Sequence, residues 1–425
     1  MLKQIFKQIW VEKRANVWLF LELFGMFVCL FAITDFFLVK WINYNEPLGH
    51  DIENTYRLDI KRLDSNSPDY INPELITDTK TEEVLKLMSQ IRQHPGIESV
   101  SLSYYANPYA RGGLYDGLHA DTTMQRINVQ GRRVTPEYFE VFRIKNHKGE
   151  PLQIPEGMNR QIVVAERTAK KLFPSANDAT GKLVYGADGV DISKYEARPA
   201  QIVAVSRDFK SEEFGSYNDC FFEIMNPVSL NMYVTEHDVQ SADICIRVRA
   251  GREQNFEEMF KENMGERLRV NNLYIASIVS FDKLRYNVVG KTIREGISMM
   301  LYITIFAMIT VSLGIFGAFW LRSRQRTSEI GIRMAMGADK TVIRKEMITE
   351  SFCLMVVSAL PAFIIYINLL YTGILDTYRV PFTIGRVAVV LFITLILMIL
   401  VIITSTLWPA NRAASVQPVD ALRDE

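Results

Sequence analysis

The chain has 425 residues, of which 48% are hydrophobic and 23% charged, and its 48 basic and 48 acidic side chains give a formal net charge of zero. This composition excludes an intrinsically disordered chain and gives no general attraction for nucleic acid. The average conceals a sharp segregation, because the apolar residues are concentrated in a few long stretches.

Four stretches are long and apolar enough to cross a bilayer. A hydrocarbon core of about 30 Å requires roughly 20 helical residues, and a helix satisfies its own backbone polar groups against lipid. We therefore expect transmembrane α-helices at residues 18–39, 296–321, 351–375 and 387–408. The apolar parts of the last three contain no Asp, Glu, Lys or Arg, and Pro361 in the third would normally kink it.

The first stretch differs because it contains Glu22 and Asp35. A basic start followed by an apolar run is also typical of a cleaved signal peptide, but no small-x-small cleavage site follows, so we interpret the run as a retained anchor helix. A charge facing lipid is costly, and neither acid has a basic partner within the membrane. We therefore expect both acids near the membrane interfaces, with proton coupling as the alternative.

The distribution of Lys and Arg predicts the orientation, because basic loops remain in the cytoplasm. Four basic residues precede the first helix, seven lie in 322–350 and two lie in 376–386. The N-terminal segment 1–17, the loop 322–350 and the tail 409–425 are thus expected inside. Residues 40–295 and the short loop 376–386 are expected outside.

The outer segment, about 256 residues long, is predicted to form a large α+β domain inserted between the first two helices. Thr79 and Glu82 form a capping-box signature before a helix that stops near Pro95. We expect strands around 100–104, 162–164, 202–205 and 244–248, and helices over 166–173 and 255–264. This alternation is typical of βαβ units, although it does not define a topology.

Common catalytic and ligand-binding motifs are absent from the sequence. It contains no G-x-x-x-x-G-K-[ST] phosphate loop, no G-x-G-x-x-G after a strand, no H-E-x-x-H and no C-x-x-C. The five histidines show no ligand spacing, so we expect no catalytic residue, cofactor or metal in this chain. Cys29 and Cys353 lie at membrane depth, whereas Cys220 and Cys245 lie in the outer domain, where a disulfide is an open alternative.

The loop 322–350 has a pattern that a simple lipid anchor would not need. Its seven basic residues alone would suit contact with anionic lipid. However, Gly331 and Gly337 are expected to interrupt a helix, and Asp339 is a good N-cap for a new helix from Lys340. An apolar stripe then follows on that helix, and a short element with two isoleucines precedes the turn, which favours a docking element for a cytoplasmic partner.

The stretch RTSEIGIRMAMGADKTVIRKEMITES resembles the characteristic cytoplasmic loop of the MacB/FtsX-type permeases of ABC transporters. VTPEYFEVFRI, IVVAERTAKKLFP with GKLV, and AQIVAVSRDFK resemble landmarks of the MacB-like periplasmic core domain. WPANRAASVQPVDALRDE resembles the closing segment of the family. The resemblance extends over essentially the whole chain, with small departures at Gly149-Glu150, Met334 and Met336.

This resemblance implies a permease subunit in the bacterial cytoplasmic (inner) membrane that works by mechanotransmission. A separate ABC ATPase would push on the loop, and the outer domain would move to export or extract a peptide, antibiotic or lipid-linked substrate. Only 17 residues precede the first helix, so the ATPase is expected on another chain. The expected ATPase-coupling surface consists of Glu329, Ile330, Gly331, Ile332, Arg333, Ala335, Met336, Gly337 and Ala338.

Other partners implied by the resemblance are a second permease copy or paralogue, membrane lipid and an extracytoplasmic adaptor or outer-membrane component. The alternative function is that of an FtsX-like regulatory protein controlling an extracytoplasmic cell-wall hydrolase, although the large outer segment favours a MacB-like protein. Tyr104 to Gly117, with Arg111, is a further candidate contact loop, because exposed aromatic residues suit recognition.

Overall fold

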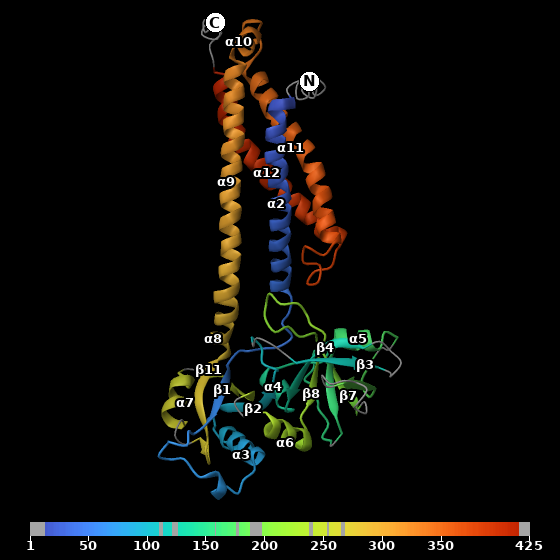
Figure 1. Ribbon diagram of the computed structural model, residues 1–425, viewed down its shortest axis with the longest axis vertical. Coiled ribbons are helices and arrows are strands. Elements are labelled where there is room, and N and C mark those ends of the chain that lie inside the picture. The colour runs from blue at the N-terminus through green and yellow to red at the C-terminus, as the bar shows by residue number, and fades with distance from the viewer. Residues whose placement is uncertain are drawn as a thin grey trace. The chain divides into compact units, whose positions relative to one another are not determined.

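The computed structural model describes residues 13–109, 114–120, 126–157, 159–175, 178–187, 198–237, 241–252, 255–264 and 268–415 (Figure 1). The chain divides into two compact units. A helical unit contains Met1–Tyr44 and Arg294–Glu425, and an α/β unit contains Asn45–Ile293.

The helical unit is built from four long helices, α2 (Lys13–Asn45), α9 (Arg294–Gln325), α11 (Lys340–Tyr371) and α12 (Ile384–Ala413). These are the described helices that are long and apolar enough to cross a membrane, and they confirm the four predicted spans. Each extends several residues beyond its apolar stretch, because backbone hydrogen bonding continues into the polar flanks. Pro361 lies inside α11 without ending it.

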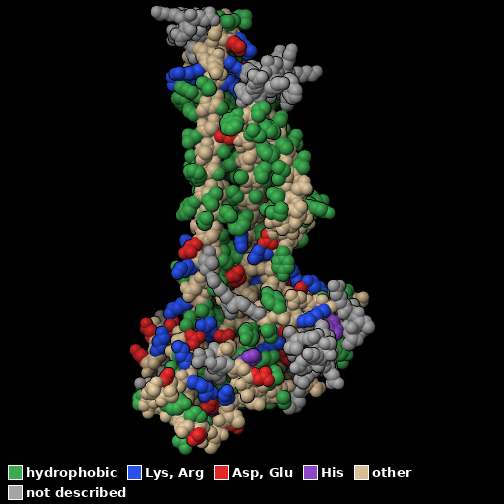
Figure 2. Space-filling view, in the orientation of Figure 1, with side chains coloured by type: hydrophobic (Ala, Val, Ile, Leu, Met, Phe, Trp, Pro, Cys, Tyr) green, Lys and Arg blue, Asp and Glu red, His purple; other side chains and the backbone are tan. Residues whose placement is uncertain are grey.

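Apolar side chains from all four helices form the core of this unit. Phe31 of α2 stacks on Tyr366 of α11 with 5.2 Å between ring centroids, and it also contacts Phe363. The predicted stripe on α11 is confirmed, because Ile343, Met347, Ser351 and Leu354 are all buried. Figure 2 shows hydrophobic side chains over the visible outer face, with Lys and Arg gathered toward the end that carries α10 (Thr327–Ala335).

The α/β unit contains eleven described strands, with helices between them. The strands are β1 (Thr55–Arg62), β2 (Ile97–Tyr104), β3 (Leu114–His119), β4 (Ile127–Val134), β5 (Gln161–Ala165), β6 (Leu183–Ala187), β7 (Arg198–Ser206), β8 (Cys220–Ile224), β9 (Asp243–Val248), β10 (Arg269–Val270) and β11 (Leu273–Ser280). The helical elements are η1 (Pro73–Leu75), α3 (Lys80–Arg92), α4 (Tyr138–Val141), α5 (Glu166–Leu172), α6 (Pro227–Glu236), α7 (Phe256–Met264), α8 (Phe281–Arg285) and a π-helical segment, η3 (Tyr286–Ile293).

The sheet follows the order β10-β11-β1-β9-β2-β4-β3-β6-β7-β5-β8, and an additional pairing joins β4 to β8. That pairing closes six strands into a ring, in the order β4, β3, β6, β7, β5 and β8. The other five strands extend the sheet from β4. Most pairs are antiparallel, whereas β4–β8 and β5–β7 are parallel. The βαβ prediction therefore holds only where α5 lies between β5 and β7.

The helices α3, α6 and α7 cover one face of the five-stranded extension. Their apolar residues, including Leu87, Leu230 and Phe256, share a core with Leu58 of β1 and Ile246 of β9. The capping box at the start of α3 is confirmed, because Thr79 and Glu82 bond to each other's backbone. This box orients α3 for burial of Val84, Leu87, Met88 and Ile91.

Charged side chains are buried where β3, β4 and β8 meet. Arg133 lies 2.9 Å from Asp116 and 3.3 Å from Glu223, and all three side chains are less than 10% exposed. A Cβ on Gly131 would lie 2.2 Å from Arg133 Nη1, so a larger residue at this position would displace the end of the Arg133 side chain. Burial of these charges is tolerated because each lies against opposite charge.

Two predictions for this unit need correction. Residues 104–117 are not one exposed loop, because Tyr104 ends β2 and is fully buried, while Leu114 to Gly117 belong to β3. The sequence misleads here because tyrosine suits both a loop and a strand; Arg111 lies outside the described residues. Cys220 and Cys245 are both free thiols on β8 and β9, so the disulfide that the sequence left open does not form.

Candidate functional site

The short helix α10 connects α9 to α11 at the end of the helical unit where α2 begins (Figure 1). Gly331 lies inside α10 and is buried, so the expectation that it would interrupt a helix is wrong. A glycine is tolerated in a helix where its missing side chain allows close packing. Gly337, in contrast, has a φ of +96° and forms the predicted turn.

The predicted start of α11 is confirmed, because the helix begins at Lys340 with Asp339 at its N-cap position. The Asp339 carboxylate accepts a hydrogen bond of 2.5 Å from the Thr341 hydroxyl. This bond lowers the pKa of Asp339, which keeps a negative charge beside the positive end of the α11 dipole.

The nine residues of the predicted coupling surface divide into two sets. Ile332 and Met336 are 47% and 76% exposed and lie one helical turn apart. Glu329, Arg333, Ala335 and Gly337 are also exposed. Ile330 packs against the helical core, Gly331 is buried and Ala338 is half-buried. These three residues therefore face the rest of the helical unit and are not free to contact a partner.

Three ion pairs connect α9 and α10 to α11. Arg322 and Arg326, one turn apart on α9 and at its end, lie 2.5 and 3.2 Å from the two carboxylate oxygens of Glu350. Arg333 of α10 bonds to Glu346 at 3.0 Å. Neither glutamate was identified from the sequence. Each glutamate pairs with an arginine 13 to 28 positions away on another element, so no pattern within one helix indicated either of them.

These contacts surround a small open recess, lined by Arg322, Ser323, Arg326, Glu329, Ile330, Arg333, Ile343, Glu346, Met347 and Glu350. Its charged walls are largely paired with one another. In the part of the chain that the structure describes, no three His, Cys, Asp or Glu side chains lie close enough together to bind a metal ion.

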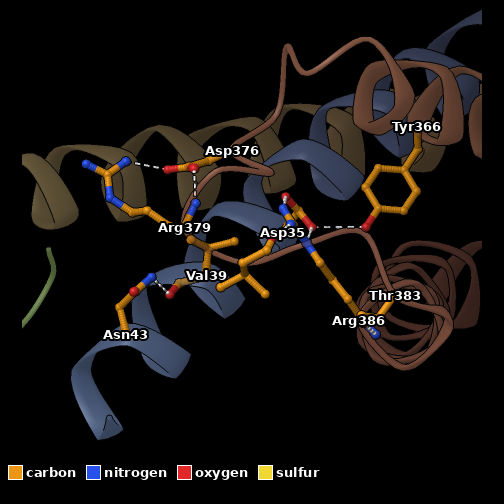
Figure 3. Close-up of polar contacts among 9 residues, drawn as sticks. Asp35, Val39, Asn43, Tyr366, Asp376, Arg379, Thr383 and Arg386 are labelled. Carbon is orange, nitrogen blue, oxygen red and sulfur yellow. Dashed lines mark hydrogen bonds and ion pairs between the residues drawn. The ribbon is translucent and has the colours of Figure 1, made fainter. Parts of the chain in front are cut away.

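At the opposite end of the helices, Asp35 has a basic partner (Figure 3). Arg386 of α12 donates two hydrogen bonds to the Asp35 carboxylate, at 2.8 and 2.6 Å, and Tyr366 of α11 donates a third at 3.0 Å. The expectation of no basic partner is therefore wrong. Arg386 was expected in the outer loop, but it lies in the first turn of α12. Its side chain is buried with Asp35.

Glu22 faces protein, in line with the rule that a membrane acid avoids lipid. Its carboxylate lies against Gly314 of α9, where an added Cβ would be 1.8 Å from Glu22 Oε1. The carboxylate thus occupies the space that a side chain at position 314 would need.

Two family descriptions match the two units. Residues 26–255 match the MacB-like periplasmic core domain, and residues 301–418 match the FtsX-like permease C-terminal domain. The chain belongs to the MacB/FtsX family of ABC transporter permeases. In this MacB/FtsX-family protein, the FtsX-like match includes α10 and every residue of the predicted coupling surface.

Curated relatives are distant. The chain is 25% identical over 300 residues to "Macrolide export ATP-binding/permease protein MacB 1" of Yersinia pestis bv. Antiqua, covering 69% of this chain and 43% of that protein. It is 23% identical over 388 residues to "Macrolide export ATP-binding/permease protein MacB" of Mannheimia succiniciproducens, covering 89% and 55%. The chain thus spans about half the length of these relatives.

Among solved structures, the periplasmic region of MacB from Actinobacillus actinomycetemcomitans aligns at 15% identity with a TM-score of 0.30. This alignment covers 59% of the present chain and 99% of that structure. The family assignment rests on the two domain matches.

Proposed function

We propose that this chain is the permease subunit of a MacB-like transporter that works by mechanotransmission. In this proposal the N-terminus, α10 and the C-terminal tail are cytoplasmic, and the α/β unit lies outside the cytoplasmic membrane. A separate ABC ATPase docks on the coupling surface, and ATP binding and hydrolysis move the helices and then the outer domain. The substrate is a peptide, an antibiotic or a lipid-linked molecule outside the membrane.

The observation that carries this proposal is the exposed apolar pair formed by Ile332 of α10 and Met336, the residue directly after that helix. Ile332 and Met336 point away from the helical core, while Ile330 and Gly331 pack toward it. Exposed apolar residues surrounded by charged ones are typical of a protein contact. Glu329 and Arg333 provide that charged surrounding on the same helix.

Mechanical coupling is supported by how α10 is attached. The Arg333–Glu346 pair joins it to α11, which continues without a break from Lys340 to Tyr371. At 1.5 Å per residue, a helix of 32 residues is about 48 Å long and crosses a bilayer. A displacement of α10 would therefore reach the far end of α11 as a shift of one packed element.

The ATPase is proposed as a separate subunit. The relatives carry both ATP-binding and permease in their names, and the match covers 43% of the Yersinia protein, on permease-type domains. The sequence of this chain contains no phosphate-binding loop. A second permease copy or paralogue would pair with the second ATPase, because ABC ATPases act in pairs.

The FtsX-like regulatory alternative is weaker. The segment that follows α2 matches the MacB-like periplasmic core domain through residue 255. This match favours a transporter of the MacB type over control of a cell-wall hydrolase.

Purification of the full chain from its native membranes tests the proposal. We expect an ABC ATPase to co-purify, and the paired substitution Ile332→Glu and Met336→Glu to remove it, because two charges would be placed in an apolar contact. Ile374→Glu is the matched control, since Ile374 is 72% exposed on the loop at the other end of α11. The proposal would be contradicted if no ATPase purified with the unmodified chain, either with or without chemical crosslinking of the membranes beforehand.

A further inference from the structure

Two tryptophans stack on each other at one end of the helical unit. Trp320 of α9 and Trp408 of α12 have ring centroids 4.8 Å apart with an interplanar angle of 19°. Phe316, one turn before Trp320, lies 5.4 Å from Trp408 and completes an aromatic surface shared by the two helices. Trp408 is 49% exposed, so this surface is not closed off by other described parts of the chain.

Two arginines lie over these rings. The Arg412 guanidinium is 4.5 Å from the Trp320 centroid and 5.5 Å from that of Trp408, and Arg324 is 5.5 Å from Trp320. Both arginines are exposed. A third cation, Arg344, reaches Asn411 beside Arg412 at 3.5 Å.

The charge around this cluster is not balanced within the described residues. Arg322, Arg326 and Arg333 each pair with a glutamate of α11. Arg324 and Arg412 have no carboxylate within ion-pair distance in the ranges that the structure describes. The nearby arginines are thus of two kinds, one held by internal acids and one directed at an aromatic surface.

The position along the helices indicates what lies outside. Trp320 and Trp408 stand at the ends of the apolar stretches of α9 and α12, and the chain becomes polar immediately beyond them. Tryptophan is typical of the membrane–water boundary, and a basic side chain just beyond it reaches the lipid phosphates. On the same side of α9 as Trp320, at spacings of 7, 11 and 14 residues, lie Leu313, Ile309 and Phe306.

These three residues are 65%, 54% and 72% exposed. They form an unpartnered apolar stripe that runs from the aromatic cluster toward the membrane centre, which is where the acyl chains of a lipid would lie. A soluble phosphate would use the arginines but would have no need of this stripe.

We propose that Trp320, Arg324, Trp408 and Arg412 form a binding site, the α9–α12 headgroup site, for the phosphate of an anionic phospholipid. The planar guanidinium groups donate paired hydrogen bonds to phosphate oxygens. The indole surface holds both cations, and the acyl chains lie against the α9 stripe. A zwitterionic lipid binds less well, because its choline repels the two arginines.

The test is native mass spectrometry of the full chain released from nanodiscs that contain equal amounts of phosphatidylglycerol and phosphatidylcholine. We expect retained phosphatidylglycerol on the unmodified chain. The paired substitution Arg324→Gln and Arg412→Gln should reduce retention about 25-fold, because each guanidinium that bonds directly to the phosphate contributes about fivefold. Arg324→Lys with Arg412→Lys should retain an intermediate amount of phosphatidylglycerol. The positive charges remain, but the planar guanidinium groups that donate paired hydrogen bonds are lost.

The matched control is Lys340→Gln with Lys345→Gln, which removes the same charge at the same end of the unit but outside the aromatic cluster. Retention equal to that of the unmodified chain supports a defined site. An equal loss in the control, or unchanged retention in the arginine variant, overturns the proposal. So does displacement of the lipid by inorganic phosphate alone, or crosslinking from Trp320 to a second copy of the chain with no lipid retained. An unchanged melting temperature confirms that each variant is folded.

Discussion

Asp35 of α2 and Arg386 of α12 form a buried ion pair, with Asp35 Oδ2 2.6 Å from Arg386 Nη2. Tyr366 donates to the same carboxylate, and the Arg386 guanidinium also donates to the Val380 carbonyl. Three helices are therefore joined by one carboxylate whose oxygens are hydrogen-bonded, which is the condition under which a buried charge is tolerated.

Removing one partner of this pair leaves an uncompensated buried charge. We expect Asp35→Asn to lower the free energy of unfolding by about 3 kcal/mol, and Asp35→Leu with Arg386→Leu to lower it by less than either single leucine variant. Thermal unfolding of the purified chain in detergent measures this. Arg379→Gln is the control, since the Arg379–Asp376 pair is partly exposed and should contribute less than about 1 kcal/mol. Additive losses in the double variant would argue against the pair.

Arg333 and Glu346 provide a test of how α10 is attached. Arg333→Glu places two acids 13 residues apart against each other across the turn, and we expect ATPase stimulation by the permease to fall about fivefold. Adding Glu346→Arg should restore it, because the pair is rebuilt in reverse. If the double variant stays inactive while remaining folded, Arg333 acts by contacting the ATPase directly. The Arg333–Glu346 ion pair would then not explain the loss of stimulation.

Alanine substitutions at Gly49 and Gly181 distinguish the cost of backbone strain from the cost of steric overlap. Both have positive φ, at +82° and +85°. A Cβ on Gly49 would lie 2.1 Å from the Asp208 carbonyl oxygen, whereas one on Gly181 would meet nothing within 4 Å. We expect Gly181→Ala to lower the free energy of unfolding by about 1 kcal/mol and Gly49→Ala by about 3 kcal/mol. Equal losses, measured by denaturant titration, would show that the close approach to Asp208 is relieved at no cost.

Asp243 should make the stability of the protein depend on pH. Burial raises its pKa to about 6, although Arg57 opposes this. Between about pH 4 and pH 6 the folded chain therefore holds a proton that the unfolded chain has lost, and stability falls as pH rises through this range. We expect Asp243→Asn to gain on the order of 2 kcal/mol at pH 7.5 and little at pH 4.

His50 makes the stability of the protein depend on pH in the opposite direction, and this effect is present in both the Asp243→Asn variant and the unmodified chain. Burial, together with Arg132, lowers its pKa to about 3, so its contribution is lost as pH falls from about 6.5 toward 3. The comparison of Asp243→Asn with the unmodified chain removes this shared background. A gain that is the same at pH 4 and pH 7.5 would mean that the charge on Asp243 is not what changes.

The four membrane helices could be predicted because a long, mainly apolar run satisfies its backbone polar groups in lipid as a helix. The Thr79 capping box and the start of α11 after Gly337 could be predicted because both depend on neighbours within a few residues. The Asp35–Arg386 pair joins residues 351 positions apart, so no local pattern revealed it.

The sheet order was equally hidden. The parallel pairing of β4 with β8, which closes the six-stranded ring, depends on contacts between Gln130 and Cys220, 90 positions apart in the chain. At the candidate site, the apolar face of α10 was visible in the sequence. The division between exposed Ile332 and buried Gly331, and the role of Glu346 and Glu350, required the packing of α9, α10 and α11 to be known.

Site-specific crosslinking from the coupling surface tests the central claim most directly. A photoreactive group on Met336→Cys in native membranes should crosslink to an ABC ATPase, because the Met336 side chain is 76% exposed on the coupling surface. The same group on Ile374→Cys should give no such product. A crosslink to the ATPase from position 374 and none from position 336 would contradict the account.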